Sequence, residues 1–104
     1  MVRCLIDNMG VADIIADKAE EVLRIAGRHG VSEIRLFGSV ARGDATQISD
    51  VDFLVVSGPD TPPWYPGGLI ADLEKLLGRE VNIVEMDALT PRVRSHVLSE
   101  AVSL

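Results

Sequence analysis

The sequence contains a single cysteine, Cys4, among its 104 residues. One thiol cannot form a disulfide within the chain, so no disulfide framework supports the fold, and Cys4 is expected to be a small buried apolar residue. The chain also does not open with the basic stretch, apolar run and cleavage site of a secretory signal peptide. These absences predict a protein of the reducing cytoplasm.

Long hydrophobic runs and an excess of basic residues are missing as well. The longest apolar run is only a few residues, far below the roughly 20 that span a bilayer, so no membrane partner is expected. Ten Lys and Arg stand against sixteen Asp and Glu, which gives a formal net charge of −6. A surface that follows a phosphate backbone needs basic charge, so direct binding to nucleic acid is not expected.

Apolar residues, in contrast, are plentiful. They make up 47% of the chain, and the mean hydropathy is +0.23. A chain of this length can bury a modest core, so residues 1–104 are expected to form a single domain. Because a small domain has a large surface for its volume, some apolar side chains must reach that surface. We therefore expect either a protein partner or self-association, in a hetero-oligomer or a homo-oligomer.

The spacing of the apolar residues predicts alternating helices and strands. Helices are expected over 11–29, over a short segment after Gly38 that ends at Arg42-Gly43, over 69–77, and from Pro91 onward with Val102 on the apolar side. Strands are expected over 33–37, 50–56 and 80–84, with a Pro- and Gly-rich loop over 57–68. This order predicts an α/β fold with a small mixed β-sheet flanked by helices.

Two chemical features occur together between Gly38 and Asp52. Gly38 and Ser39 lie between a predicted strand and a predicted helix, where backbone N–H groups and a hydroxyl can converge on a phosphate. Asp50 and Asp52 are two residues apart at the start of a strand, so they share a face with Cα atoms about 7 Å apart. Their carboxylates can converge on hard cations, and paired Mg²⁺ ions support phosphoryl chemistry. Together the two features predict a site for a metal-bound triphosphate.

Each feature also has an ordinary structural explanation. Gly38-Ser39 alone is a common turn and helix cap. Asp50 and Asp52 could be a solvated strand end, but two carboxylates that open a buried strand repel each other unless a cation compensates. Arg42 either contacts phosphate or pairs with Asp44, and both interpretations stay open.

The motif resembles that of a known superfamily. Gly38-Ser39, ten intervening residues and then Asp50-Val51-Asp52-Phe53 resemble the signature of the DNA-polymerase-beta-like nucleotidyltransferases. More narrowly, Phe37-Gly38-Ser39 with Ala41-Arg42-Gly43 and Ser49-Asp50 resembles the MNT (minimal nucleotidyltransferase) antitoxins that are paired with HEPN toxins. The resemblance covers residues 34–56 in motif and extends through 78–84 and the last helix in layout.

This resemblance implies a polymerase-beta-like fold and a Mg²⁺-dependent protein adenylyltransferase. Such an enzyme transfers AMP from ATP to a tyrosine hydroxyl of its HEPN RNase partner and silences it. By position, Asp50 and Asp52 are the implied catalytic and metal-binding residues, and Gly38 and Ser39 are the implied phosphate ligands. Arg42 matches the subfamily motif, and its contact with phosphate is inferred from its charge and proximity.

The sequence departs from the family pattern at one position. Related MNT domains usually read Val-Asp-Leu-Val where this chain has Val81-Asn82-Ile83-Val84. The expected third carboxylate is thus an amide, which cannot carry a charge or take a proton. We expect ATP binding to survive this change better than catalysis. Either Glu80 or Glu85 could take the place of the missing acid.

Two other functions therefore stay open. The first is a catalytically weakened or inactive MNT domain that neutralises its toxin by binding alone. The second is a small-molecule nucleotidyltransferase that acts on a drug hydroxyl, although such enzymes usually need an additional domain to hold the acceptor.

Overall fold

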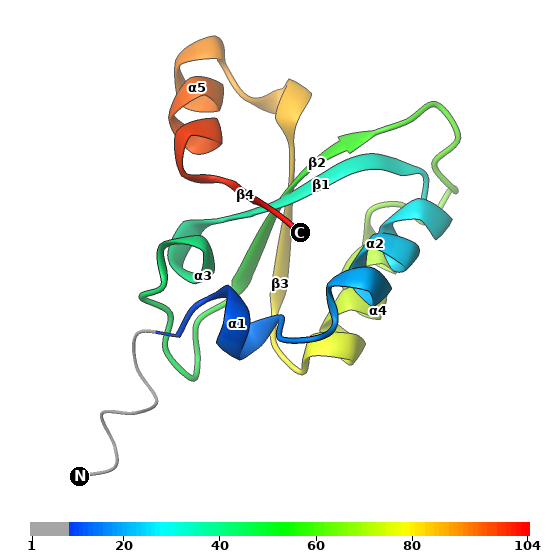
Figure 1. The fold of residues 1–104 in the computed structure, drawn as a ribbon. Coiled ribbons are helices and arrows are strands. Elements are labelled where there is room, and N and C mark those ends of the chain that lie inside the picture. Colours follow the sequence, from blue (N-terminus) through cyan, green and yellow to red (C-terminus); the bar gives the residue numbers. More distant parts are fainter. Residues whose placement is uncertain (1–8) are drawn as a thin grey trace, which may run out of the picture.

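The structure is a computed structural model, and it describes residues 9–104. Cys4 lies outside the described residues, so its expected burial stays a prediction. Four strands form one sheet in the order β3-β2-β1-β4 (Figure 1). These strands are β1 (Val31–Phe37), β2 (Val51–Ser57), β3 (Val81–Glu85) and β4 (Val102–Ser103).

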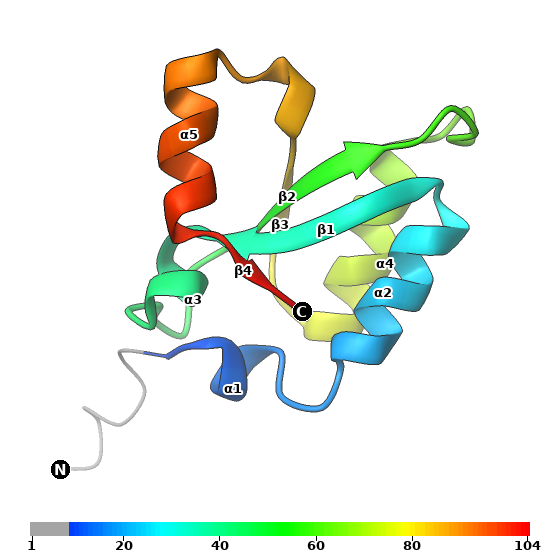
Figure 2. The ribbon, with the colours of Figure 1, turned by 45° about the horizontal axis from the view of Figure 1, so that its top comes forward.

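The sheet is mixed, as the sequence predicts. Strand β1 is antiparallel to both β2 and β4, whereas β2 and β3 are parallel. The helices are α1 (Val11–Ile14), α2 (Ala19–Arg28), α3 (Gly38–Arg42), α4 (Gly67–Leu77), the 3₁₀ turn η2 (Met86–Ala88) and α5 (Pro91–Glu100). Helix α2 packs on β1, α4 packs on β3, and the two helices contact each other. In both ribbon views, β1 and β2 run between α5 and the α2–α4 pair (Figures 1 and 2).

Strand β2 is the central strand that its sequence predicts. The side chains of Val51, Phe53 and Val55 are 0% exposed, and Leu54 is 1% exposed, so the strand is covered on both faces. Burial of an apolar side chain of this size contributes roughly 1.5–3 kcal/mol. Asp52 is only half-buried. The core therefore holds β2 rigidly and leaves the carboxylates of its first residues accessible.

The single helix predicted over residues 11–29 is wrong. The chain forms α1, turns at Ala16 with φ 51°, and starts α2 at Ala19. With this turn, Ile14 and Ile15 before it and Val22 of α2 after it are all buried in the core. Burial of both apolar sets outweighs the propensity for one continuous helix.

Strand β4 was not predicted from the sequence, because Val102 was assigned to the last helix. Helix α5 starts at Pro91 as predicted, and Thr90 Oγ1 accepts a hydrogen bond from the Val93 N–H. It ends at Glu100, however, and Ala101 is extended with ψ 145°. Val102 then pairs with Leu36 at the edge of the sheet. Backbone pairing with β1 thus replaces the last helical turn.

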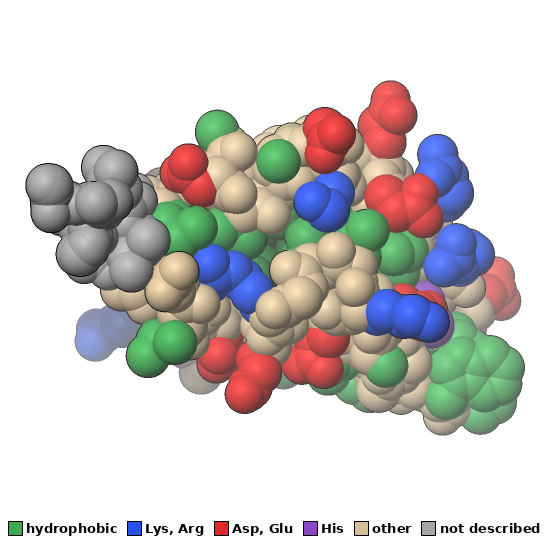
Figure 3. Space-filling model, turned by 90° about the horizontal axis from the view of Figure 1, so that it is seen from below, with side chains coloured by type: hydrophobic (Ala, Val, Ile, Leu, Met, Phe, Trp, Pro, Cys, Tyr) green, Lys and Arg blue, Asp and Glu red, His purple; other side chains and the backbone are tan. Residues whose placement is uncertain are grey.

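Several large apolar side chains reach the surface, as the hydropathy predicts. Leu23 is 46% exposed, Trp64 is 64% exposed and Ile48 is 92% exposed. On the face seen from below, hydrophobic side chains are interspersed with acidic and basic ones (Figure 3). Within residues 9–104, no helix is long and apolar enough to cross a membrane.

Candidate active site

The predicted acidic residues lie where two parallel strands begin. The register of β2 against β3 places Asp52 beside Asn82. The Val51 N–H donates to the carbonyl oxygen of Glu80 at 2.9 Å, which locks the first residues of the two strands together. Asp50, immediately before Val51, therefore lies at the same edge of the sheet as Asn82.

The side-chain amide of Asn82 joins the two carboxylates. Its Nδ2 donates to Asp52 Oδ1 at 2.9 Å and to Asp50 Oδ2 at 3.2 Å. An N–H donor between two carboxylates offsets the repulsion between their like charges. Asn82 thus occupies the position at which the family resemblance expects a third acid.

This arrangement fits a divalent cation. One oxygen of each carboxylate lies within 3.2 Å of the Asn82 nitrogen, so a cation that binds both carboxylates takes the place of that N–H group. Carboxylate and amide oxygens are the ligands that Mg²⁺ prefers, and an amide carries an oxygen as well as a nitrogen. Among residues 9–104, no group of three or more His, Cys, Asp or Glu side chains is placed to hold a metal. The described oxygen atoms that meet here are therefore those of the two carboxylates, with the nitrogen of the Asn82 amide between them.

Neither of the two glutamates supplies the missing carboxylate. Glu85 lies at the other end of β3, where its Oε1 accepts from Ser57 Oγ at 3.0 Å and its Oε2 accepts from the Tyr65 hydroxyl. Glu80 is exposed just before β3. Among residues 9–104, neither glutamate forms a group of three acidic ligands with Asp50 and Asp52.

Gly38 packs directly against the site. Its φ is 76°, and a Cβ atom at this position would lie 2.4 Å from Asp52 Oδ2. A side chain here would collide with the carboxylate, and the backbone conformation also favours glycine. Ser39 follows as the second residue of α3 and is half-buried. The turn between β1 and α3 and the start of β2 therefore form one continuous surface.

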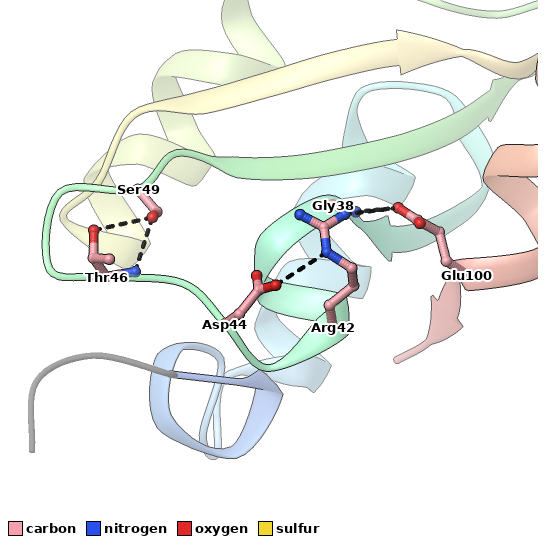
Figure 4. Close-up of polar contacts among 6 residues, drawn as sticks. All are labelled: Gly38, Arg42, Asp44, Thr46, Ser49 and Glu100. Carbon is pink, nitrogen blue, oxygen red and sulfur yellow. Dashed lines mark hydrogen bonds and ion pairs between the residues drawn. The ribbon is translucent and has the colours of Figure 1, made fainter.

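Arg42 and Glu100 lie beside the Gly38 turn (Figure 4). Arg42 Nε donates to Asp44 Oδ2 at 3.2 Å, which confirms the pairing with Asp44. Glu100 Oε1 accepts from Arg42 Nη1 at 3.2 Å and from the Gly38 N–H at 3.3 Å. The hydrogen bond from Arg42 to Asp44, with a smaller contribution from Glu100, raises the pKa of the guanidinium above its ordinary value. The contact of Arg42 with phosphate stays a prediction.

Two further residues near this site carry no signal in the local sequence. Glu100 is 62 positions away from Gly38 along the chain, and nothing in the α5 sequence marks it. Arg79 donates two hydrogen bonds to the loop that precedes Asp50. Both contacts are non-local, so no local pattern of residues could have revealed them.

A known protein family matches most of the chain. The family described as Nucleotidyltransferase domain matches residues 17–104, which include every site residue named above.

The chain belongs to the nucleotidyltransferase domain family.

Relatives in this nucleotidyltransferase family extend over most of the chain. Protein adenylyltransferase MntA of Thermococcus cleftensis is 40% identical over 76 residues, which are 72% of this chain and 76% of that protein. A Methanocaldococcus jannaschii protein named as a candidate protein adenylyltransferase, MJ0435, is 32% identical and covers 81% of this chain and 90% of its own length. The chain is accordingly a transferase, and the resemblance to MNT domains is confirmed.

Solved structures confirm the predicted polymerase-beta-like fold of this nucleotidyltransferase. One that is described as a candidate minimal nucleotidyltransferase has a TM-score of 0.80 and 42% identity, and covers 92% of this chain and 97% of its own. Another, described as a toxin-antitoxin with AMP-PNP, has a TM-score of 0.69 at 18% identity and covers 82% of this chain and 70% of its own. The second likeness concerns the fold alone.

Proposed function

We propose that this nucleotidyltransferase is an antitoxin that transfers AMP from ATP to a tyrosine hydroxyl of a cognate HEPN RNase toxin. The pairing of Asp50 and Asp52 at one edge of the sheet, with the Gly38 turn packed against Asp52, carries the proposal. The names of the relatives, which are protein adenylyltransferases, support the reaction. The toxin-antitoxin structures with the same fold support the kind of partner.

Each residue of the site has a distinct role in this proposal. Asp50 and Asp52 hold Mg²⁺, which when bound neutralises charge on the phosphates and on the reacting oxygens. Gly38 and Ser39 hold the phosphates that leave as pyrophosphate, and Arg42 adds a positive charge beside them. The tyrosine oxygen bonds to the α-phosphorus as the bond to pyrophosphate breaks, and the phenolic proton passes to water.

The surface supports a protein partner rather than a nucleic acid or a membrane. The net charge of −6 favours encounter with a basic toxin. The exposed Ile48 and Trp64 side chains offer apolar contact area. We place this pair of proteins in the cytoplasm, with residues 1–104 acting as a single domain within a hetero-oligomer.

Mass spectrometry of the co-expressed toxin tests the proposal. We expect the toxin to gain mass in multiples of one adenylyl group, and this gain to disappear when Asp50→Ala and Asp52→Ala are combined. Asp17→Ala combined with Asp87→Ala is the matched control, because it removes two carboxylates from exposed positions outside the site. An unmodified toxin beside the unsubstituted chain contradicts the proposed transfer.

The position of Asn82 favours one alternative, neutralisation of the toxin by binding alone. Both N–H bonds of its amide are directed at the carboxylates, and the amide cannot supply the negative charge of a third acid. Incubation with radiolabelled ATP, Mg²⁺ and toxin separates the two functions. Inhibition of the RNase without label on the toxin supports binding alone, whereas inhibition with label supports transfer.

A further inference from the structure

The segment that delivers Asp50 to the site has little regular structure of its own. Residues 46–49 form a turn in which Ser49 Oγ accepts from the Thr46 N–H at 2.8 Å (Figure 4). The Ile48 N–H donates to Thr46 Oγ1 at 3.3 Å, and the Ile48 side chain is 92% exposed. Such a surface turn buries few apolar groups and is held mainly by hydrogen bonds.

The guanidinium group of Arg79 ties this turn to the rest of the molecule. Arg79 Nη1 donates to the carbonyl oxygens of Thr46 at 2.8 Å and Ser49 at 2.9 Å. Its Nη2 also contacts Met9 Sδ at 3.5 Å. Arg79 is half-buried and lies between α4 and β3, three residues before Asn82. It therefore connects the segment before Asp50 to the segment before Asn82.

The two aspartates depend on this connection to different degrees. Asp52 lies inside β2, where it pairs with Phe37 of β1 on one side and with Asn82 of β3 on the other. Asp50 precedes the strand and has no partner in either register. Two hydrogen bonds from a charged donor are stronger than neutral ones, and the planar guanidinium fixes their direction. The contacts of Arg79 thus bear on Asp50 far more than on Asp52.

We infer that Arg79 is a positioning residue that holds Asp50 in place beside Asn82 and so sets the affinity of the site for a divalent cation. This inference rests on the proposed function, in which Asp50 and Asp52 hold the cation. It assigns to Arg79 no contact with substrate or metal.

Arg94 provides a matched control. Its Nε donates to the Met86 carbonyl oxygen at 3.2 Å and its Nη2 donates to the Leu89 carbonyl oxygen at 3.0 Å. Like Arg79, it is half-buried and holds two carbonyl groups of one turn. That turn, however, follows the other end of β3. Arg79→Met and Arg94→Met therefore remove the same chemistry from opposite ends of the strand.

Manganese titration followed by electron paramagnetic resonance tests the inference in the full chain, with a non-hydrolysable ATP analogue present. We expect Arg79→Met to weaken Mn²⁺ binding about tenfold, as is typical when the support of a metal ligand is lost. Arg94→Met should bind Mn²⁺ like the unsubstituted chain. In ¹⁵N-labelled protein, the amide resonances of Ser49 and Asp50 should shift in Arg79→Met, while that of Phe53 stays in place.

The possible results distinguish failure of the proposed function from failure of the role assigned to Arg79. An unsubstituted chain that binds no Mn²⁺ overturns both the proposed function and this inference. If that chain binds Mn²⁺ and a folded Arg79→Met variant binds it equally well, only the inference is overturned. If Arg79→Met does not fold, Arg79→Gln is the second variant, because its shorter, uncharged amide cannot replace the two charged hydrogen bonds to Thr46 and Ser49. Mn²⁺ binding several-fold weaker than in the unsubstituted chain then supports the inference, and unchanged binding overturns it.

Discussion

Gly38 and Asp52 lie so close that a Cβ atom on Gly38 would be 2.4 Å from Asp52 Oδ2. Carbon and oxygen atoms that are not bonded to each other do not approach so closely, so any other residue would displace the Asp52 carboxylate and would be strained at the φ of 76°. The turn that we propose for phosphate and the carboxylate that we propose for metal are therefore in direct contact. Gly38 serves the packing of the site as well as its backbone conformation.

Substitution of Gly38 by Ala should damage both stability and the site. The φ of 76° and the contact with Asp52 are each unfavourable for alanine, and we expect a loss of about 1–3 kcal/mol in the free energy of unfolding, measured with urea. ATP binding should weaken in parallel. Gly27→Ala is the control, because a Cβ atom there meets nothing within 4 Å in α2. The free energy of unfolding of that variant should rise by roughly 0.5–1 kcal/mol. Equal changes in the free energy of unfolding for Gly38→Ala and Gly27→Ala would contradict a special role of Gly38 in the packing of the site.

Replacement of Asn82 by Asp should raise the rate of AMP transfer. The change restores the third acid of the family, but it also places three carboxylates together in the absence of metal. We therefore expect the melting temperature without metal to fall, and the increase on addition of Mg²⁺ to exceed that of the unsubstituted chain. Asn82→Ala removes the amide without adding charge. This variant should show neither a higher rate of AMP transfer nor a larger increase in melting temperature on addition of Mg²⁺. An unchanged rate and unchanged Mg²⁺ dependence would show that position 82 lies outside the metal site.

Removal of the charge of Glu100 should strengthen nucleotide binding. Its carboxylate accepts hydrogen bonds from Gly38 and Arg42, the groups that we propose for the phosphates. Glu100→Gln should tighten ATP binding by up to about fivefold in calorimetry, since a partly exposed ion pair contributes up to about 1 kcal/mol. Glu33→Gln removes an equivalent charge that pairs with Arg35 on β1 and should leave the affinity unchanged. If both variants bind ATP like the unsubstituted chain, Glu100 does not weaken nucleotide binding and the prediction is wrong.

Tyr65 should titrate above the ordinary tyrosine range. Its partial burial, and secondly its hydrogen bond to Glu85, raise the pKa of the phenol. It is the one tyrosine of the chain, so an ultraviolet titration reports on it alone. The midpoint should lie above about 10 in the folded protein and return to about 10 in denaturant.

The raised pKa of Tyr65 also makes stability depend on pH. Because the folded state favours the neutral phenol, the stabilising contribution is complete below about pH 10 and is lost as the pH rises further. Tyr65→Phe removes the hydrogen bond to Glu85, so its free energy of unfolding should be lower by about 1 kcal/mol at neutral pH. This variant should lack the decline in stability at alkaline pH. Unfolding curves measured at several pH values check the difference. An equal alkaline decline in Tyr65→Phe would contradict the role of the phenol.

The part of the fold that the sequence predicts rests on local signals. The wholly apolar run after Asp52 predicts a strand covered on both faces, and the structure confirms it. Thr90-Pro91 predicts the start of α5, and Gly78 predicts the end of α4. In each case the physical cause lies within a few residues of the signal, as capping, fixed backbone angles or alternating burial. The spacing of Asp50 and Asp52 is likewise a local property.

What only the tertiary structure decided depends on residues that lie far apart in the chain. The pairing of Val102 with Leu36 produced β4 and shortened the last helix, and core packing broke the first helix at Ala16. In the site, the hydrogen bonds from Asn82 to Asp50 and from Gly38 to Glu100 join segments separated by 32 and 62 positions. Such contacts are set by strand register and by the burial of a shared core. A local run of residues cannot encode either of them, although it specifies the residues that make the contacts.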